Sequence, residues 1–178
     1  MTASISPGAE QLAILRRAMR GVHEQTDRKF SVFDLRKSAD YAAFLQAHSR
    51  VLTWIEPALL AAPNLPEWLP RRDFIESDLN ELGIALPQKI DAAMPQEDGA
   101  LLGAVYVLEG SRLGGRWLAE QVPVDMPRRY LGAAHPQGSW ARFLRALEEA
   151  FEKHPEYGPG ALAGAHAVFA AFDRAAGG

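Results

Sequence analysis

Residues 98–121 read DGALLGAVYVLEGSRLGGRWLAEQ, and this stretch decides the fold class. Its LLGAVYVL part is almost wholly apolar, which is typical of a helix that other elements bury on every side. The same segment carries Gly110, Gly114 and Gly115, although each interior glycine costs a helix roughly 1 kcal/mol relative to alanine. Two interpretations stay open: a neighbouring backbone packs against these glycines, or a flat, bulky ligand lies there.

Helical periodicity continues along the rest of the chain, where apolar residues recur at three- and four-residue spacing. A first helix is predicted around 12–26, and a second begins at Ser38, which we expect to act as its N-cap. The proline-rich stretch PNLPEWLP then breaks the chain, because proline cannot continue a regular hydrogen-bonded element. A third helix is predicted over 71–82 and ends at Gly83.

The C-terminal part of the chain predicts two more helices after a connection over 122–138 that holds at most one short helical turn. One begins at Ser139 and the last follows YGPGA. We find no alternating strand pattern, repeat or linker. The sequence therefore predicts an all-α, single-domain helical bundle of about six main helices, covering residues 1–178 with about 1–8 as a flexible N-terminal tail.

Composition excludes several classes of protein. The absence of cysteine rules out disulfides, thiolate metal sites and a cysteine nucleophile. A net charge of -3 argues against a general nucleic-acid binder. The N-terminus shows no signal peptide, and no apolar run is long enough to span a bilayer. We therefore expect a cytoplasmic protein with no nucleic-acid or membrane partner.

Five histidines are candidates for chemistry. His23, His48 and His166 lie on predicted helical faces beside apolar residues, whereas His135 and His154 precede prolines in predicted loops and are expected to be solvated. For each of the first three, a hydrogen-bonded core histidine is the more common outcome.

Spacing distinguishes His23 from the others. Arg16 lies seven residues earlier on the same helical face, about 10 Å away along the axis. An imidazole and a cation at that separation could hold the metal centre and a peripheral anion of one large ligand. Asp27, one turn after His23, could orient the imidazole by a hydrogen bond. The alternative is a solvated arginine on a surface helix.

Two segments together resemble a known family. YVLEGSRLGGR and LRRAMRGVHEQTDRKFSVFDL are similar to the corresponding segments of biliverdin-producing haem oxygenases of the bacterial, phytochrome-associated type. The order of the remaining segments also fits, so the resemblance covers nearly the whole chain: WLPRRDFIESDLNELG, WARFLRALEEA and GAHAVFAAFDRA.

The resemblance implies a haem held between two helices. His23 matches the proximal ligand of the iron, and Arg16 matches a basic residue that pairs with a haem propionate. Arg142 or Arg145 is expected to serve the second propionate. The residues that match the kinked distal helix, over the other haem face, are Gly110, Ser111, Gly114 and Gly115. Some family members carry an aspartate that organises water where this chain has Ser111.

The resemblance also implies a reaction and partners. Haem is both substrate and cofactor, and O2 converts it to biliverdin, carbon monoxide and ferrous iron. Electrons come from an external reductase or ferredoxin, and a bacteriophytochrome could receive the biliverdin. The main alternative is a non-catalytic haem-binding or sensory protein on the same fold. A thiaminase-like enzyme would need a cysteine that this chain lacks, and a cofactor-free helical interaction domain would use the glycines for packing alone.

Overall fold

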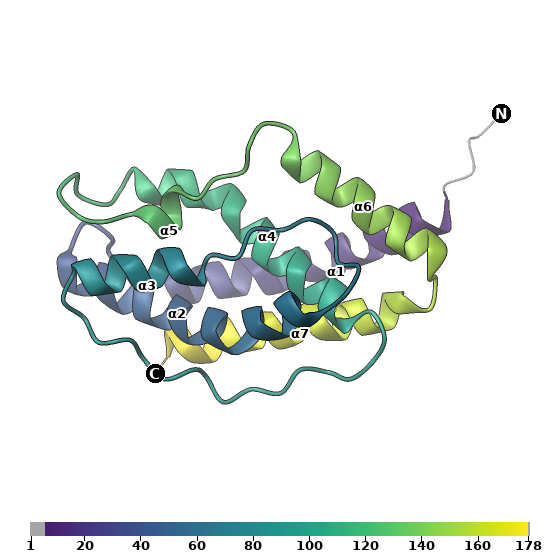
Figure 1. Ribbon diagram of the computed structural model, residues 1–178, viewed down its shortest axis with the longest axis horizontal. Coiled ribbons are helices and arrows are strands. Elements are labelled where there is room, and N and C mark those ends of the chain that lie inside the picture. Colours follow the sequence, from purple (N-terminus) through teal and green to yellow (C-terminus); the bar gives the residue numbers. More distant parts are fainter. Residues whose placement is uncertain (1–5, 178) are drawn as a thin grey trace.

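Within residues 6–177, which the computed structural model describes, every regular element is a helix and no strand occurs. The prediction of an all-α fold is thereby confirmed. Seven helices follow one another within these described residues, and the fifth is a single short turn in the connection predicted over 122–138 (Figure 1). They are α1 (Pro7–Phe30), α2 (Ser38–Ala61), α3 (Arg72–Glu81), α4 (Ala100–Ala119), α5 (Arg129–Gly132), α6 (Ser139–Lys153) and α7 (Tyr157–Ala176).

Two predicted N-terminal boundaries are wrong. Helix α1 already begins at Pro7, because the Ser6 hydroxyl caps it by accepting a hydrogen bond from the Ala9 amide at 3.2 Å. Pro7 and Gly8 are thus helical and not part of a tail, and residues 1–5 lie outside the described residues. Ser38 does not cap α2 but is its first helical residue, and its hydroxyl donates to the sulfur of Met126 instead.

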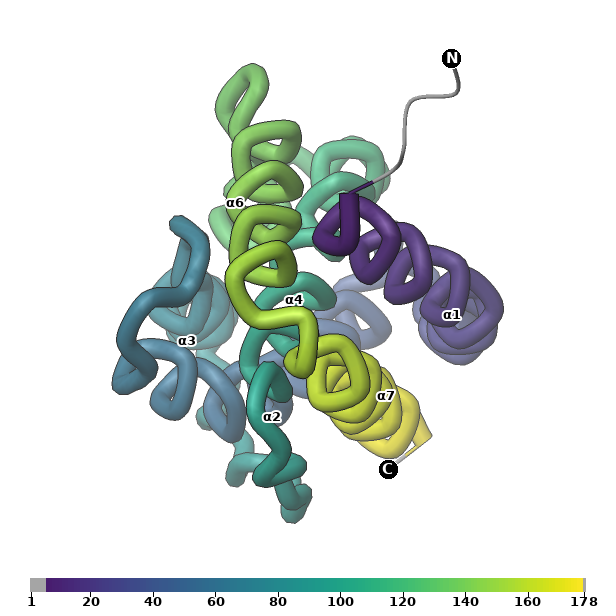
Figure 2. Tube along the Cα trace, turned by 90° about the vertical axis from the view of Figure 1, so that its right-hand side faces the viewer, coloured from purple at the N-terminus to yellow at the C-terminus, as the bar shows by residue number. Residues whose placement is uncertain are grey.

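Helix α7 packs against α1, α2 and α4 (Figures 1 and 2). Its contact with α4 is especially close. A Cβ atom at Gly103 of α4 would collide with the carbonyl of Ala161, and one at Gly164 of α7 would collide with the carbonyl of Ala100. These two glycines, which the sequence analysis did not single out, therefore serve helix packing.

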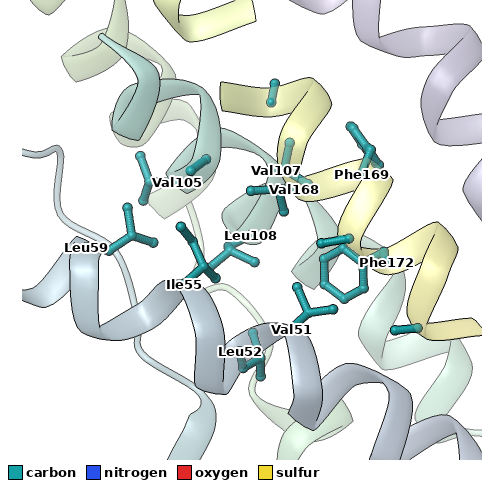
Figure 3. Packing of buried hydrophobic residues seen from close by; sticks show 14 of the residues in the cluster. Val51, Leu52, Ile55, Leu59, Val105, Val107, Leu108, Val168, Phe169 and Phe172 are labelled. Atoms are coloured by element: carbon teal, nitrogen blue, oxygen red, sulfur yellow. The ribbon is translucent and has the colours of Figure 1, made fainter. Parts of the chain in front are cut away.

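All seven helices contribute side chains to the core, and Figure 3 shows the part where α2, α4 and α7 meet. The residues labelled there are Val51, Leu52, Ile55 and Leu59 of α2, Val105, Val107 and Leu108 of α4, and Val168, Phe169 and Phe172 of α7. His48 of α2 packs against Phe172 at the edge of this core, and its Nδ1 lies 3.0 Å from the Phe44 carbonyl. Burial lowers the pKa of His48 to about 3, so this histidine is a neutral core residue.

Two other histidines differ from expectation. His166 lies on the exposed side of α7 rather than on an apolar face. The side chain of His135, expected to be solvated, is instead 8% exposed, and its Nε2 lies 2.8 Å from the Glu109 carbonyl. None of the helices in the described part of the chain has the length and apolarity that a membrane span requires.

Candidate functional site

One face of α4 carries an exposed apolar surface interrupted by glycine. Because residues three and four apart share a helical face, Tyr106, Gly110, Leu113, Gly114 and Trp117 lie on one side of α4, and we call this set the glycine face. Leu113 is 55% exposed and Trp117 is 67% exposed, although both are large and apolar. A Cβ atom at Gly114 would meet nothing within 4 Å. The glycine face thus borders open space at Gly114.

The other two glycines of the predicted distal site have different surroundings. A Cβ atom at Gly110 would lie 3.8 Å from Cη2 of Trp140, which is an ordinary contact. A Cβ atom at Gly115 would lie 2.9 Å from the Leu131 carbonyl oxygen of α5. Of the two interpretations left open for these glycines, the packing of a neighbouring backbone therefore accounts for Gly115, because the backbone of α5 lies next to it. In Figure 1 the second half of α4 runs at an angle to its first half.

The hydroxyl of Ser111 is already engaged. It donates to the Leu108 carbonyl at 2.7 Å and accepts from a guanidinium nitrogen of Arg71 at 2.6 Å. Arg71 is buried, donates also to the Leu108 carbonyl at 2.9 Å, and lies 4.9 Å from the ring centre of Tyr130. A hydroxyl has one proton and two acceptor lone pairs. Ser111 can therefore accept one more hydrogen bond but has no proton left to donate.

Arg112 points to the opposite side of α4 from the glycine face. Its guanidinium donates to Glu109 at 2.7 Å and to the carbonyls of Ala133 and Ala134, both at 3.0 Å. The side chains of Arg112 and Glu109 are both almost fully buried, and His135 lies 3.6 Å from the same carboxylate. This network anchors the connection before α6 to the back of α4, so Arg112 supplies no cation to the open face.

His23 presents an exposed imidazole on α1. Its side chain is 55% exposed, and its Nδ1 lies 3.5 Å from a carboxylate oxygen of Asp27. The edge of the ring packs against Phe169 of α7, with 5.8 Å between ring centres. When Asp27 accepts the Nδ1 proton, Nε2 keeps its lone pair, which is the form of imidazole that ligates a metal. Asp27 thus lies next to the imidazole, although the 3.5 Å separation is longer than a hydrogen bond, and the orienting role of Asp27 stays a prediction.

The charge of Arg16 on α1 acts on Tyr106 of α4. Burial raises the pKa of Tyr106, and the positive charge of Arg16 lowers it in part, so the guanidinium acts on this end of the glycine face. Both helices run from right to left in Figure 1 and do not pack closely on one another. His23 follows Arg16 by about 10 Å along α1, and Gly114 follows Tyr106 by about 12 Å along α4.

The two predicted partners of the second propionate both lie on α6. Arg142 and Arg145 are exposed on α6, and within residues 6–177 neither forms an ion pair. A surface cavity of about 740 Å³ lies elsewhere, between α2, the segment 87–91 and the end of α7. The lining of this cavity contains no histidine, so it cannot supply an imidazole ligand. The candidate ligand site is therefore the face of α1 that carries His23 together with the glycine face of α4.

The residues of the two faces fit a haem. A flat macrocycle needs a helix that lacks side chains, and Gly114 borders open space. Its iron needs an accessible imidazole, which His23 offers, and its carboxylates need a cation, which Arg16 offers on the exposed side of α1. Within the described residues no cluster of three His, Asp or Glu side chains could hold a bare metal ion. A porphyrin supplies its own nitrogen ligands and needs no such cluster.

Sequence reasoning missed several residues at this site. Leu113 and Trp117 could have been found from helical spacing, since both share the face of Gly114. Arg71 and Trp140 could not, because only the packing of α3 and α6 brings them to α4.

Comparisons with known proteins give two matches. A curated heme oxygenase of Xanthomonas campestris pv. campestris is 34% identical, with 74% of this chain and 86% of that protein covered. The crystal structure of an NO- and CO-bound heme oxygenase from Neisseria meningitidis superposes with a TM-score of 0.78 at 26% identity, covering 97% of this chain and 91% of that one. No protein-family model matches the chain.

Proposed function

This chain belongs to the haem oxygenase family, and we propose that it cleaves haem at a meso carbon to biliverdin, carbon monoxide and ferrous iron. O2 and electrons from an external reductase or ferredoxin complete the reaction, and a bacteriophytochrome accepts the product. The open position at Gly114, on the face of α4 that exposes Leu113 and Trp117, is the observation that carries the proposal.

The chain's own residues bind and orient the substrate. His23 holds the iron through Nε2, while Asp27 keeps the Nδ1 proton in place and Phe169 restricts the tilt of the ring. Arg16 anchors a propionate. When bound, haem supplies the iron at which oxygen is activated against the porphyrin edge. Gly114 leaves room on the distal side for oxygen and water, at the cost of some helix stability.

Ser111 limits what the distal side can do with protons. Its single free lone pair can accept a hydrogen bond from an ordered water, and Arg71 holds the hydroxyl oxygen in one position. A serine in this state fixes a water without donating a proton to it. Proton delivery must then come from water. This engaged hydroxyl also favours the alternative function, a haem-binding or sensory protein that does not turn haem over.

A single experiment separates the two functions. Haemin is added to the purified protein, ascorbate is then added under air, and the visible spectrum is followed. Loss of the Soret band together with growth of biliverdin absorption is the expected result. A stable ferrous complex, with no loss of the Soret band, would contradict the oxygenase and support the binding protein.

A further inference from the structure

The glycine face of α4 differs in chemistry at its two ends. At one end Tyr106 lies within the electrostatic influence of Arg16. At the other end Leu113 and Trp117 stand one turn apart, on either side of Gly114 in the sequence, and more than half of each residue is exposed. Single exposed apolar residues are common. Leu113 and Trp117, however, are two large apolar residues on the same face as Gly114, and together they form an apolar surface suited to binding a ligand or partner.

Haem has a matching asymmetry. Its two propionates lie on one edge of the macrocycle, and the opposite edge carries only apolar substituents. A haem whose propionates point toward Arg16 therefore directs an apolar edge along α4 toward Trp117. The distance along α4 from Tyr106 to Trp117 is about 16 Å, which is comparable with the width of a porphyrin.

We propose that Leu113 and Trp117 form an apolar wall that covers the edge of haem away from the propionates and fixes the rotation of haem in its own plane. The rotation decides which meso carbon is cleaved, so the two side chains are specificity-determining residues. This inference rests on the proposed function for its substrate. It concerns residues that the family resemblance did not single out.

A second copy of the chain is a poorer cover. A stable protein interface buries about 800 Å² per partner, whereas one Trp side chain buries only about 150–250 Å². The apolar wall adds one leucine to that, and its neighbours on the face are glycines. Continuity with the open position at Gly114 and the charge at the far end both favour haem as the occupant.

The test measures how fast haem leaves the protein, which does not depend on turnover. Haemin is loaded onto wild type, Leu113→Ala, Trp117→Ala and Trp117→Phe, and its transfer to excess apomyoglobin is followed. Val124→Ala is the matched control, because Val124 is 88% exposed but lies in the loop after α4. We expect Trp117→Ala to release haem about tenfold faster, Leu113→Ala to release it faster by a smaller factor, and Trp117→Phe and Val124→Ala to stay near wild type.

Chromatography of the biliverdin isomers provides the second measurement, and a broader isomer mixture is expected from Trp117→Ala. Unchanged release and an unchanged mixture in Trp117→Ala would overturn the wall while leaving the proposed function intact. Failure of wild type to form biliverdin would instead contradict the proposed function, and the release rates would still decide the wall. If Trp117→Ala changes only the sedimentation of the haem-free protein, the surface joins two copies and the inference is wrong.

Discussion

The carbonyl oxygen of Leu131 lies 2.9 Å from the point that a Cβ atom at Gly115 would occupy. At Gly114, the adjacent residue, the same point has no neighbour within 4 Å. Two consecutive positions of one helix therefore lack a side chain for different physical reasons. Gly115 allows α5 to pack against α4, and Gly114 borders the open space that we assign to haem. The two positions form a matched pair for experiment.

Replacement of each glycine by alanine should distinguish these two reasons. Gly114→Ala should leave the haem-free protein unchanged or stabilise it by up to about 1 kcal/mol, because alanine is the better helix former. Gly115→Ala should destabilise it by about 1–3 kcal/mol, because the added methyl group overpacks a backbone contact. Thermal and urea unfolding of the haem-free variants provide the measurement.

Haem adds a second contrast at the same positions. Gly114→Leu should lower haem affinity or oxygen activation more than Gly114→Ala does, since the larger side chain enters the proposed haem space. A Gly114→Ala protein that unfolds at a much lower temperature than wild type yet turns haem over normally would contradict the proposal that haem occupies the space at Gly114.

His23 is the predicted iron ligand, and its replacement gives a spectroscopic test. His23→Ala should keep the helical circular dichroism, because the side chain is largely exposed, but lose the histidine-ligated ferric spectrum and most turnover. His166→Ala is the control, since His166 is an exposed histidine on α7. Retention of the axial-ligand signature in His23→Ala would exclude this assignment.

Arg16 should affect the orientation of haem more than its affinity. An exposed ion pair contributes about 0–1 kcal/mol, so Arg16→Ala should weaken haem binding by about fivefold at most. Loss of the anchor should redistribute the biliverdin isomers, which chromatography resolves. Arg17→Ala, at an equally exposed neighbouring position of α1, is the control. Equal affinity and an equal isomer ratio in the Arg16 variant would remove Arg16 from the site.

The helices could be predicted from the sequence because their signals are local. The apolar spacing of α1, α2 and α6 and the left-handed glycine at Gly83 after α3 depend on neighbouring residues only. The end of a helix depends on caps, and there the alternatives are close in energy. Ser38 illustrates this. Its hydroxyl donates a hydrogen bond to the sulfur of Met126, which is distant in the sequence, and does not cap an amide of α2.

The site could be predicted only in part, for a related reason. A glycine appears in the sequence whether a ligand or a neighbouring backbone takes the space of the missing side chain. Gly114 and Gly115 therefore cannot be told apart until the position of α5 is known. His135 looks solvated beside its proline, yet the fold places it against Glu109, far away in the sequence. Contacts of this kind depend on how helices cross, and one sequence carries no local signal for them.

Asp173 should stabilise the attachment of α1 to α7. Its carboxylate accepts hydrogen bonds from Thr26 at 2.6 Å, Lys29 at 2.7 Å and Gln25 at 3.0 Å. Asp173→Asn should lower the free energy of unfolding at pH 7 by about 1–2 kcal/mol, because bonds to a charged group are lost. Urea unfolding measures the change, and Asp125→Asn in an exposed loop is the control.

The acid dependence of this effect follows from the pKa. Burial alone would raise the pKa of Asp173, but the hydrogen bonds from Lys29, Thr26 and Gln25 outweigh it and hold the pKa below its usual range. A carboxyl with a lowered pKa in the folded state stabilises above the unfolded pKa of about 4 and loses that contribution as pH falls further. The difference between wild type and Asp173→Asn should therefore shrink below pH 4. If the difference in unfolding free energy between the two proteins stays constant down to pH 2, the charge of Asp173 does not contribute to the attachment of α1 to α7.

His48 should make the protein less stable in weak acid. Its pKa lies at about 3, because burial and, to a smaller extent, the charge of Arg71 lower it and the bond to the Phe44 carbonyl offsets them only in part. Because the unfolded pKa is about 6.5, the unfolded chain binds a proton between pH 6.5 and 3 that the folded chain does not, so stability rises with pH in that window. His48→Gln, which keeps a hydrogen-bond donor, should be less stable at pH 7 but should lose less stability than wild type between pH 6.5 and 4.5. Urea unfolding at these pH values measures the slopes, with His166→Gln as the exposed control. Parallel slopes for wild type and His48→Gln would show that His48 titrates alike in the folded and unfolded states, contrary to its burial among Phe30, Phe44 and Phe172.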